Sequence, residues 1–230
     1  QESFSRIPGM PIAYWVNQRV LDLFNNINLG KIAESKGGLS STDNNRFLRF
    51  WHEVEFDNID FDCISVEQTI NSICKWFCFN KGGEYRKWYG NRWYIVNWKN
   101  NGAEIKEATK GAAGGRIVNP EYYFKESVSC GAITTGENSF RFYPKGAIFD
   151  INFRSLFFKE EDKYYYLGLL NSVVIKYFGK ILCSTIALNG NDISRFPVVI
   201  ETSKKGKVKS LVSQCIDISK TDWDSYEVSW

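Results

Sequence analysis

The stretch Asn80-Lys81-Gly82-Gly83-Glu84-Tyr85-Arg86-Lys87-Trp88-Tyr89-Gly90-Asn91-Arg92-Trp93-Tyr94-Ile95-Val96-Asn97-Trp98 combines glycines, cations and aromatic rings. A glycine pair lets a ligand approach the backbone, cations attract phosphate, and rings stack on bases or fill a core. We interpret residues 80–92 as a contact loop, with an ordinary exposed loop as the alternative. Residues 93–98 are typical of the core strand that would hold this loop.

Charge is segregated along the chain. Residues 75–99 hold six basic side chains and one acid, a balance of +5 against +3 for the whole chain. Residues 50–70 carry six acids and no Lys or Arg, and residues 203–220 carry five lysines against Asp217. Such a chain can bind a polyanion through one face while staying near neutral overall. The alternative is that each block is ordinary solvated surface.

Composition predicts a globular cytoplasmic protein without a membrane span. The chain has 230 residues, of which 43% are apolar and 24% charged, and no apolar run approaches the roughly 18 residues of a membrane helix. Six scattered cysteines are expected to be free thiols, and a single histidine, His52, leaves a zinc site without ligands. Because the sequence starts with Gln1, we expect a piece of a larger protein.

Hydrophobic periodicity predicts an α+β fold, strand-rich and mostly antiparallel, bracketed by helices. We expect two parts: a strand-rich core with an N-terminal helix over 1–160, and a helical part packed on it over 161–230, which together could form one continuous domain. The expected helices cover 11–24, 66–73, 102–109, 162–170, 172–182 and a tail segment around 208–216. The expected strands cover 46–56, 76–79, 93–98, 127–134, 139–143, 147–151 and 155–158.

The chain shows no catalytic constellation. Asn119-Pro120-Glu121-Tyr122 resembles the Asn-Pro-Pro-Tyr signature of amino-methyltransferases, but Glu121 replaces the second proline and no glycine-rich cofactor turn precedes it. The glycines and alanines of 111–115 lack the Lys-Ser/Thr of a phosphate loop. We therefore expect no catalytic residue, no metal and no cofactor in this chain.

Six stretches together carry a family resemblance: Ile7–Val16, Gly38–Arg49, Asn80–Trp98, Tyr143–Asp150, Tyr166–Ser172 and Asn191–Val198. They resemble the C-terminal target-recognition region of large adenine-specific DNA methyltransferases, those of BREX phage-defence systems (PglX) and of type II restriction–modification. The Leu167-Gly168-Leu169-Leu170-Asn171-Ser172 run also occurs in TaqI-like specificity domains. Two departures are Thr42-Asp43-Asn44, which lacks the usual glycine, and the bulky Phe153 and Arg154 where small residues are common.

The resemblance implies a non-catalytic module that recognises double-stranded DNA. An N-terminal methyltransferase domain of the same polypeptide would bind S-adenosylmethionine and methylate a flipped adenine. Other defence-system subunits are further possible partners. Phosphate contacts are predicted at Lys81, Arg86 and Lys87 beside Gly82 and Gly83. Base-edge contacts are predicted at Asn44, Asn45 and Arg46, with a second polar set at Thr134, Thr135, Ser139 and Arg141.

Two other classes of function remain open from the residues. The chain could be a protein-interaction module that docks defence-system subunits or a DNA-mimicking phage inhibitor, with the acidic stretch Glu53 to Glu67 as a contact. It could also bind carbohydrate, because Trp88, Tyr89 and Trp93 could stack on sugars. The direction in which these rings point separates the alternatives.

Overall fold

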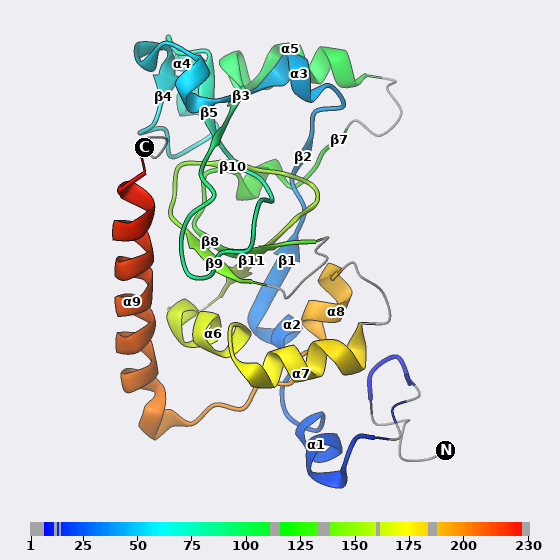
Figure 1. The fold of residues 1–230 in the computed structure, drawn as a ribbon. Coiled ribbons are helices and arrows are strands. Elements are labelled where there is room, and N and C mark those ends of the chain that lie inside the picture. Colours follow the sequence, from blue (N-terminus) through cyan, green and yellow to red (C-terminus); the bar gives the residue numbers. More distant parts are fainter. Residues whose placement is uncertain are drawn as a thin grey trace.

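The structure is a computed structural model that describes residues 7–11, 13, 15–110, 116–132, 139–159, 162–183 and 188–226. Two sheets and a small two-stranded pair lie one above the other, with most helices at one end and a long helix along the side (Figure 1). Six of the eight strand pairings are antiparallel and two are parallel. The predicted α+β class, strand-rich and mostly antiparallel, is confirmed.

The first sheet has the strand order β1-β11-β8-β9 and the second the order β10-β5-β6-β3, with β4 paired to β5. The strands of the first sheet are β1 (Ala33–Lys36), β8 (Ser127–Gly131), β9 (Arg141–Tyr143) and β11 (Phe153–Phe158). The strands of the second are β3 (Leu48–Phe50), β4 (Ile59–Asp60), β5 (Trp76–Asn80), β6 (Tyr94–Asn97) and β10 (Ile148–Phe149). The separate pair consists of β2 (Leu39–Ser40) and β7 (Arg116–Ile117).

Several helices begin at a residue whose side chain caps them. Ser172 caps α7 by accepting a hydrogen bond from the Ile175 amide, and Asn189 and Asp192 form a capping box on α8. The α-helices are α1 (Gln18–Leu23), α2 (Leu29–Ile32), α3 (Asn44–Phe47), α4 (Gln68–Asn71), α5 (Lys99–Thr109), α6 (Lys163–Leu170), α7 (Val173–Leu182), α8 (Gly190–Ser194) and α9 (Thr202–Asp224). Short 3-10 helices occupy Trp51–Glu53, Phe56–Asn58 and Pro120–Tyr122.

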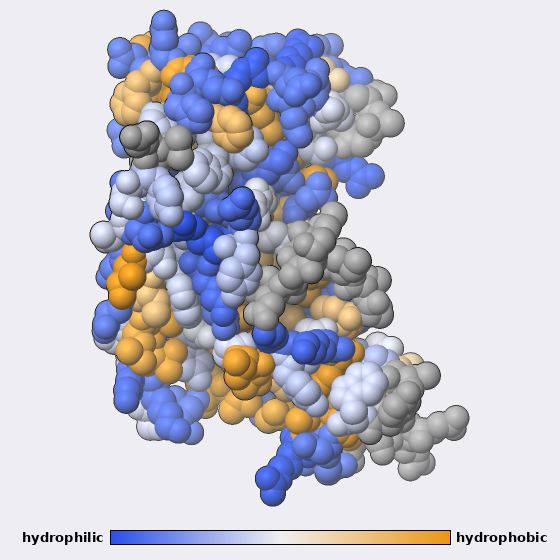
Figure 2. All heavy atoms as spheres, in the orientation of Figure 1, coloured by the Kyte–Doolittle hydropathy of each residue, from blue (hydrophilic) through white to orange (hydrophobic). Residues whose placement is uncertain are grey.

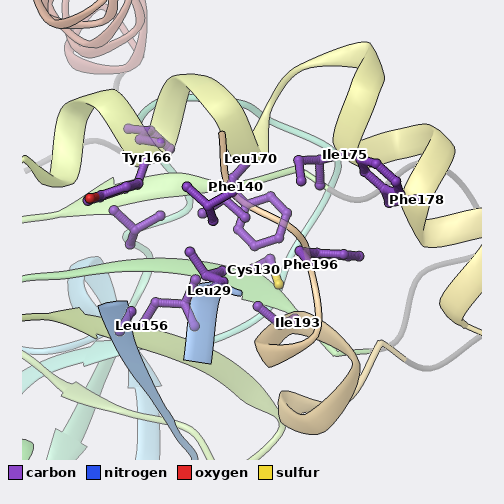
Figure 3. Packing of buried hydrophobic residues seen from close by; sticks show 14 of the residues in the cluster. Leu29, Cys130, Phe140, Leu156, Tyr166, Leu170, Ile175, Phe178, Ile193 and Phe196 are labelled. Carbon is purple, nitrogen blue, oxygen red and sulfur yellow. The ribbon is translucent and has the colours of Figure 1, made fainter. Parts of the chain in front are cut away.

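One core joins the first sheet to the helices. Figure 3 shows Tyr166, Leu170, Ile175 and Phe178 of the helices packed over the sheet residues Cys130 and Leu156. Because this cluster combines residues from both sides of position 160, the two predicted parts share a core, while their boundary stays a prediction. The long helix α9 packs on α6 at Gly168, where a Cβ would lie 2.9 Å from a methyl group of Val212, so the close approach needs glycine.

A second core lies under the other sheet. All five residues of β5 are buried, as is typical of a central strand, and the apolar run that predicted 76–79 as a strand reflects this burial. Phe77, Phe79 and Val96 pack there with Trp98, which is fully buried. The predicted core strand after the contact loop is confirmed as β6.

Three predicted elements differ from the structure. The helix expected over 11–24 covers only α1. The strand expected over 46–56 covers only β3, because residues 46 and 47 belong to α3 and the chain turns into a 3-10 helix after Phe50. The helix expected over 66–73 covers only α4, and its predicted apolar face is wrong, because Ile70 and Ile73 are 55% and 87% exposed while Thr69 is buried. Spacing alone could not show that no element of the fold packs on that face.

Candidate nucleic-acid interface

Residues 81–93 leave β5 in one sheet, reach β9 in the other and return to β6 (Figure 1). At the far point the Trp88 amide donates to the Phe140 carbonyl at 3.1 Å, and the Phe142 amide donates to the Trp88 carbonyl at 2.8 Å. The segment thus extends the edge of β9 and spans both sheets. We call residues 81–93 the basic loop.

The basic loop is held from inside by Arg141, a side chain that is 1% exposed. Its Nη1 donates to the carbonyl oxygens of Glu84 and Arg86, both at 3.2 Å, and its Nε donates to the Tyr143 hydroxyl at 3.1 Å. Burial of a guanidinium is unfavourable unless its donors find acceptors, and these three acceptors satisfy it. A base-edge contact does not fit this burial, so Arg141 supports the loop from below.

Arg86 joins the basic loop to the last turns of α9. Its Nη1 lies 2.8 Å from Asp222 Oδ2, and its guanidinium lies 5.2 Å from the ring centre of Trp223 and 5.7 Å from that of Tyr226. Gly90 makes room for this contact, because a Cβ there would lie 2.4 Å from Arg86 Cδ and the residue has a φ of +123°. A cation predicted to bind phosphate therefore already has partners within the protein.

The other predicted phosphate contacts are also engaged, yet they stay partly exposed. Lys81 Nζ lies 3.6 Å from Asp150 Oδ2, and Lys87 Nζ donates to the Asn171 carbonyl oxygen at 3.3 Å. Asn171 in turn donates to the Phe140 carbonyl and accepts from the Phe140 amide, which ties α6 to the edge of β9. The Asn of the predicted Leu-Gly-Leu-Leu-Asn-Ser run thus lies directly behind the basic loop.

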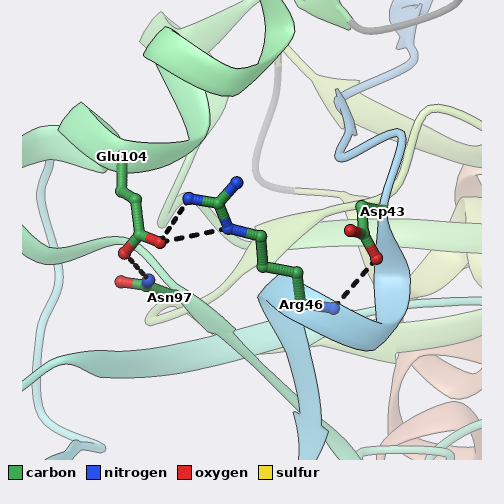
Figure 4. A network of polar contacts seen from close by, with 4 residues as sticks. All are labelled: Asp43, Arg46, Asn97 and Glu104. Carbon is green, nitrogen blue, oxygen red and sulfur yellow. Dashed lines mark hydrogen bonds and ion pairs between the residues drawn. The ribbon is translucent and has the colours of Figure 1, made fainter.

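The base-edge candidates Asn44, Asn45 and Arg46 lie together on α3 and are exposed. Asp43 caps this short helix by accepting from the Arg46 amide at 3.0 Å. Figure 4 shows the Arg46 guanidinium donating to Glu104 Oε1, with Nη2 at 2.9 Å, while Asn97 Nδ2 donates to Glu104 Oε2 at 2.7 Å. The hydrogen bonds from Arg46, and next from Asn97, lower the pKa of the Glu104 carboxyl.

The second polar set does not form one exposed site. Thr134 and Thr135 lie outside the described residues. Ser139 is buried, at 8% exposed, and Arg141 is buried as described above. Within the described part of the chain, exposed candidates therefore come from α3 and the basic loop.

Five lysines that are far apart in the sequence line one cavity of about 880 Å³ beside β8 and β11. They are Lys125, Lys145, Lys159, Lys163 and Lys209. Glu34 and Glu126 also line it, so the charged lining residues have a surplus of three positive charges, from five lysines and two acids. We call this site the lysine cavity. A cationic concavity raises the local concentration of anions.

Both acids of the lysine cavity are neutralised by neighbours. Glu34 accepts from Lys36 Nζ at 2.9 Å and from the Tyr122 hydroxyl at 2.7 Å, and these bonds lower its pKa. Glu126 accepts from Lys163. Lys125, Lys145 and Lys159 are exposed and form no ion pair within the described part of the chain. Lys125 Nζ also lies 5.0 Å from the centre of the Tyr122 ring, a contact that leaves its charge without a carboxylate partner among the described residues.

Two known proteins have sequences similar to the whole of this chain. The chain is 34% identical over 236 residues to adenine-specific methyltransferase PglX of Lacticaseibacillus casei (strain Zhang), a match that covers all of the chain and 19% of the relative. It is 34% identical over 233 residues to adenine-specific methyltransferase BrxX of Escherichia coli O9:H4 (strain HS), covering all of the chain and 18% of the relative. No protein-family model matches.

The predicted resemblance to PglX-type methyltransferases is confirmed. The chain spans about a fifth of the length of the curated relatives it matches. The stretches that carried the PglX-type resemblance contribute much of the site: residues 80–98 form the basic loop and β6, residues 143–150 supply Lys145, and residues 166–172 supply Asn171.

The cysteines and the methyltransferase-like tetrad have structural surroundings. All six cysteines are free, and burial raises the pKa of Cys63 to about 11 and of Cys78 to about 12, which disfavours thiolate nucleophiles. Within the described ranges no group of three or more His, Cys, Asp or Glu is placed to hold a metal ion. Asn119 of the methyltransferase-like tetrad donates to the Gly37 carbonyl at 2.8 Å, a structural contact.

Among the described helices, none has the length and apolar character needed to cross a membrane.

Sequence reasoning missed the lysine cavity, because its residues come from separate loops and from four of the predicted elements. Only the pairing of β8 with β11 and the packing of α9 on α6 bring them together. Of the three rings in the carbohydrate alternative, Tyr89 is buried and Trp88 packs against the first core, while Trp93 packs there and also lines a cavity. The three rings therefore do not form one exposed face for a sugar.

Proposed function

We propose that the chain is a non-catalytic module that holds and reads double-stranded DNA for an adenine-specific DNA methyltransferase of the PglX type, in phage defence or restriction–modification. The lysine cavity carries this proposal. Three exposed lysines around a concavity have no ion-pair partner in the part of the chain that the structure describes. Such a site suits the charge-driven binding of a phosphate backbone. The names of the two relatives supply the methylated base, adenine.

The proposal divides the contacts by role. The lysine cavity and the exposed parts of Lys81, Arg86 and Lys87 hold phosphates, while Asn44, Asn45 and Arg46 on α3 meet base edges. Arginine reads guanine and asparagine reads adenine in the major groove. Methyl transfer, with S-adenosylmethionine, belongs to another part of a longer polypeptide.

DNA binding by the 230-residue chain tests the proposal directly. Fluorescence anisotropy with a 24-base-pair duplex should give a Kd that rises steeply with salt, with a slope of about 0.9 for each phosphate contact. Arg46→Ala should cost about 1–3 kcal/mol at one base position and little at the others. Absence of binding at low salt would overturn the proposal. Methylation-sensitive sequencing of cells that carry a longer PglX-type polypeptide would report the recognised motif.

A second function, protein docking, is favoured by one observation. Phe56, Ile64, Ile70 and Ile73 are 55–87% exposed around α4, and five exposed acids lie among them in sequence: Glu53, Glu55, Asp57, Asp62 and Glu67. Figure 2 shows apolar side chains among hydrophilic ones at the end of the molecule that carries α4. Such a patch fits a protein surface with apolar side chains ringed by Lys and Arg.

We propose that another part of the same longer polypeptide covers this patch. Hydrogen exchange of the longer polypeptide should then protect residues 56–73 relative to the 230-residue chain. Ile73→Asp should remove that protection without changing the DNA affinity of the 230-residue chain. Equal exchange of residues 56–73 in both proteins would exclude this partner.

A further inference from the structure

A cavity of about 580 Å³ lies between the basic loop, β3 and the end of α9. Six of its twelve lining residues carry Phe, Tyr or Trp rings: Phe50, Tyr85, Trp93, Tyr94, Trp223 and Tyr226. Tyr85 and Tyr226 are more than half exposed, at 57% and 51%, and Phe50 is 37% exposed. We call it the aromatic cavity. Exposed rings at a concave site offer stacking faces to a planar ligand.

One wall of the aromatic cavity is itself a stack of rings. Phe50 stacks on His52 with ring centres 5.6 Å apart and planes 3° apart, and on Tyr94 with centres 4.9 Å apart. His52 is exposed at the end of this stack. A flat heterocycle can continue such a stack at little cost in ordering, because the rings are already aligned.

Gly82 lines the aromatic cavity at a position where no other atom of the protein packs against it. A Cβ at Gly82 would find no atom within 4 Å, and its φ is outside the left-handed region. By contrast, a Cβ at Gly83 would lie 2.7 Å from Asn91 Nδ2, so packing explains that glycine. The backbone at Gly82 is therefore open to close approach by a ligand in the cavity that it lines.

Polar groups at the same wall match the edge of a base. Arg86 uses Nη1 for Asp222, which leaves further donors of its guanidinium at the cavity, and the exposed Glu84 supplies a carboxylate acceptor. A nucleobase combines a flat ring with acceptors and donors along one edge, as well as an attached phosphate.

We propose that the aromatic cavity takes an unstacked nucleobase of the DNA that the chain binds. This inference rests on the proposed function. Stacking on aromatic side chains compensates an unstacked base for the stacking that it loses in the duplex. The aromatic cavity thus adds a base-holding site to the phosphate-holding lysine cavity.

Binding of three 24-base-pair duplexes to the 230-residue chain tests the inference: one fully paired, one with a single bulged adenine, and one with an abasic bulge. The bulged adenine should raise affinity about tenfold over the paired duplex, from one stacked base, and the abasic bulge should not. Gly82→Trp, whose Cβ would meet no atom within 4 Å and whose ring would occupy space in the cavity, should bring the ratio of the two affinities to about one. Gly206→Trp, at an equally open position on α9, should leave that ratio near ten.

The possible outcomes distinguish failure of the base-binding inference from failure of the proposed function. If the paired duplex binds but the bulged adenine gives no advantage, or the abasic bulge gives the same advantage, the inference is wrong and the proposed function stands. If Gly82→Trp keeps the ratio while its thermal unfolding matches the unsubstituted chain, the base lies elsewhere and the inference is wrong. If no duplex binds at low salt, the proposed function itself fails.

Discussion

The basic loop and the lysine cavity are both cationic, yet they use their charges in opposite ways. In the loop, Arg86 pairs with Asp222, Lys81 lies near Asp150, and Arg141 below donates to two loop carbonyls. In the lysine cavity, Lys125, Lys145 and Lys159 form no ion pair within the described residues. A dense cationic stretch in a sequence can therefore be internal scaffolding, while scattered lysines form the available anion site.

The largest expected effect is a loss of stability on substitution of Arg141. Arg141→Met would remove the donor of the Arg86 carbonyl and of the Tyr143 hydroxyl, while the Glu84 carbonyl keeps its hydrogen bond from Asn91 Nδ2. Each lost partner of a buried group costs about 1–3 kcal/mol. We expect urea unfolding to show a loss of about 3–4 kcal/mol. The exposed Lys145→Met is the control and should change stability by less than about 0.5 kcal/mol. Equal stability of the two variants would contradict a scaffolding role.

Substitutions in the lysine cavity should weaken DNA binding and leave stability nearly unchanged. Alanine at Lys125, Lys145 and Lys159 together should flatten the salt slope of DNA binding by about 2.7 and lower affinity at 0.1 M salt by about a hundredfold or more. Stability should stay within about 1 kcal/mol, since the side chains are exposed. Alanine at Lys31, Lys204 and Lys207, which are also exposed, removes the same charge elsewhere. A similar change of the salt slope in both triple variants would mean that the cavity lysines contribute only as general surface charge.

A smaller effect on stability should distinguish Arg86, which joins the basic loop to α9, from Lys87, which does not. Arg86→Gln removes a partly exposed ion pair and two ring contacts, which together contribute about 1–2 kcal/mol. Hydrogen exchange should speed up at residues 84–91 and at the end of α9, because the contact joins them. Lys87→Gln is the matched comparison, since its one hydrogen bond to Asn171 should contribute less. Unchanged exchange at α9 in Arg86→Gln would mean that the contact does not hold the loop.

The smallest expected effect is a pH dependence at α3. The hydrogen bond from Arg46 holds the pKa of Glu104 below its ordinary value of 4.5 in the folded chain. The pair therefore stabilises the fold above pH 4.5 and loses this contribution as the pH falls through the lowered pKa. Both side chains are about half exposed, at 53% and 46%, so we expect only a few tenths of a kcal/mol. Glu104→Gln should remove that part of the acid-side slope in urea unfolding; an identical slope would show that the pair contributes nothing.

Local signals predicted the parts of the fold that local chemistry determines. The apolar run at β5, the turn at Pro144 to Gly146 and the cap at Ser172 each predicted an element that the structure contains. The partners of the loop cations could not be predicted, because Asp222 lies 136 residues from Arg86. The exposed face of α4 was missed for the same reason: helical spacing shows which side chains share a face, but only the tertiary fold shows whether anything covers them.

The contact of Arg86 with Asp222, Trp223 and Tyr226 makes the end of α9 a latch for the basic loop. Two distant segments that hold each other in place are thermodynamically coupled. A ligand that binds more tightly when the latch is closed also shifts the latch toward the closed state by the same factor. A protein that binds the last turn of α9 and pulls it away would lower the affinity of the loop for such a ligand by an equal factor. The reading of DNA and the occupancy of this helix end would then act as mutual effectors.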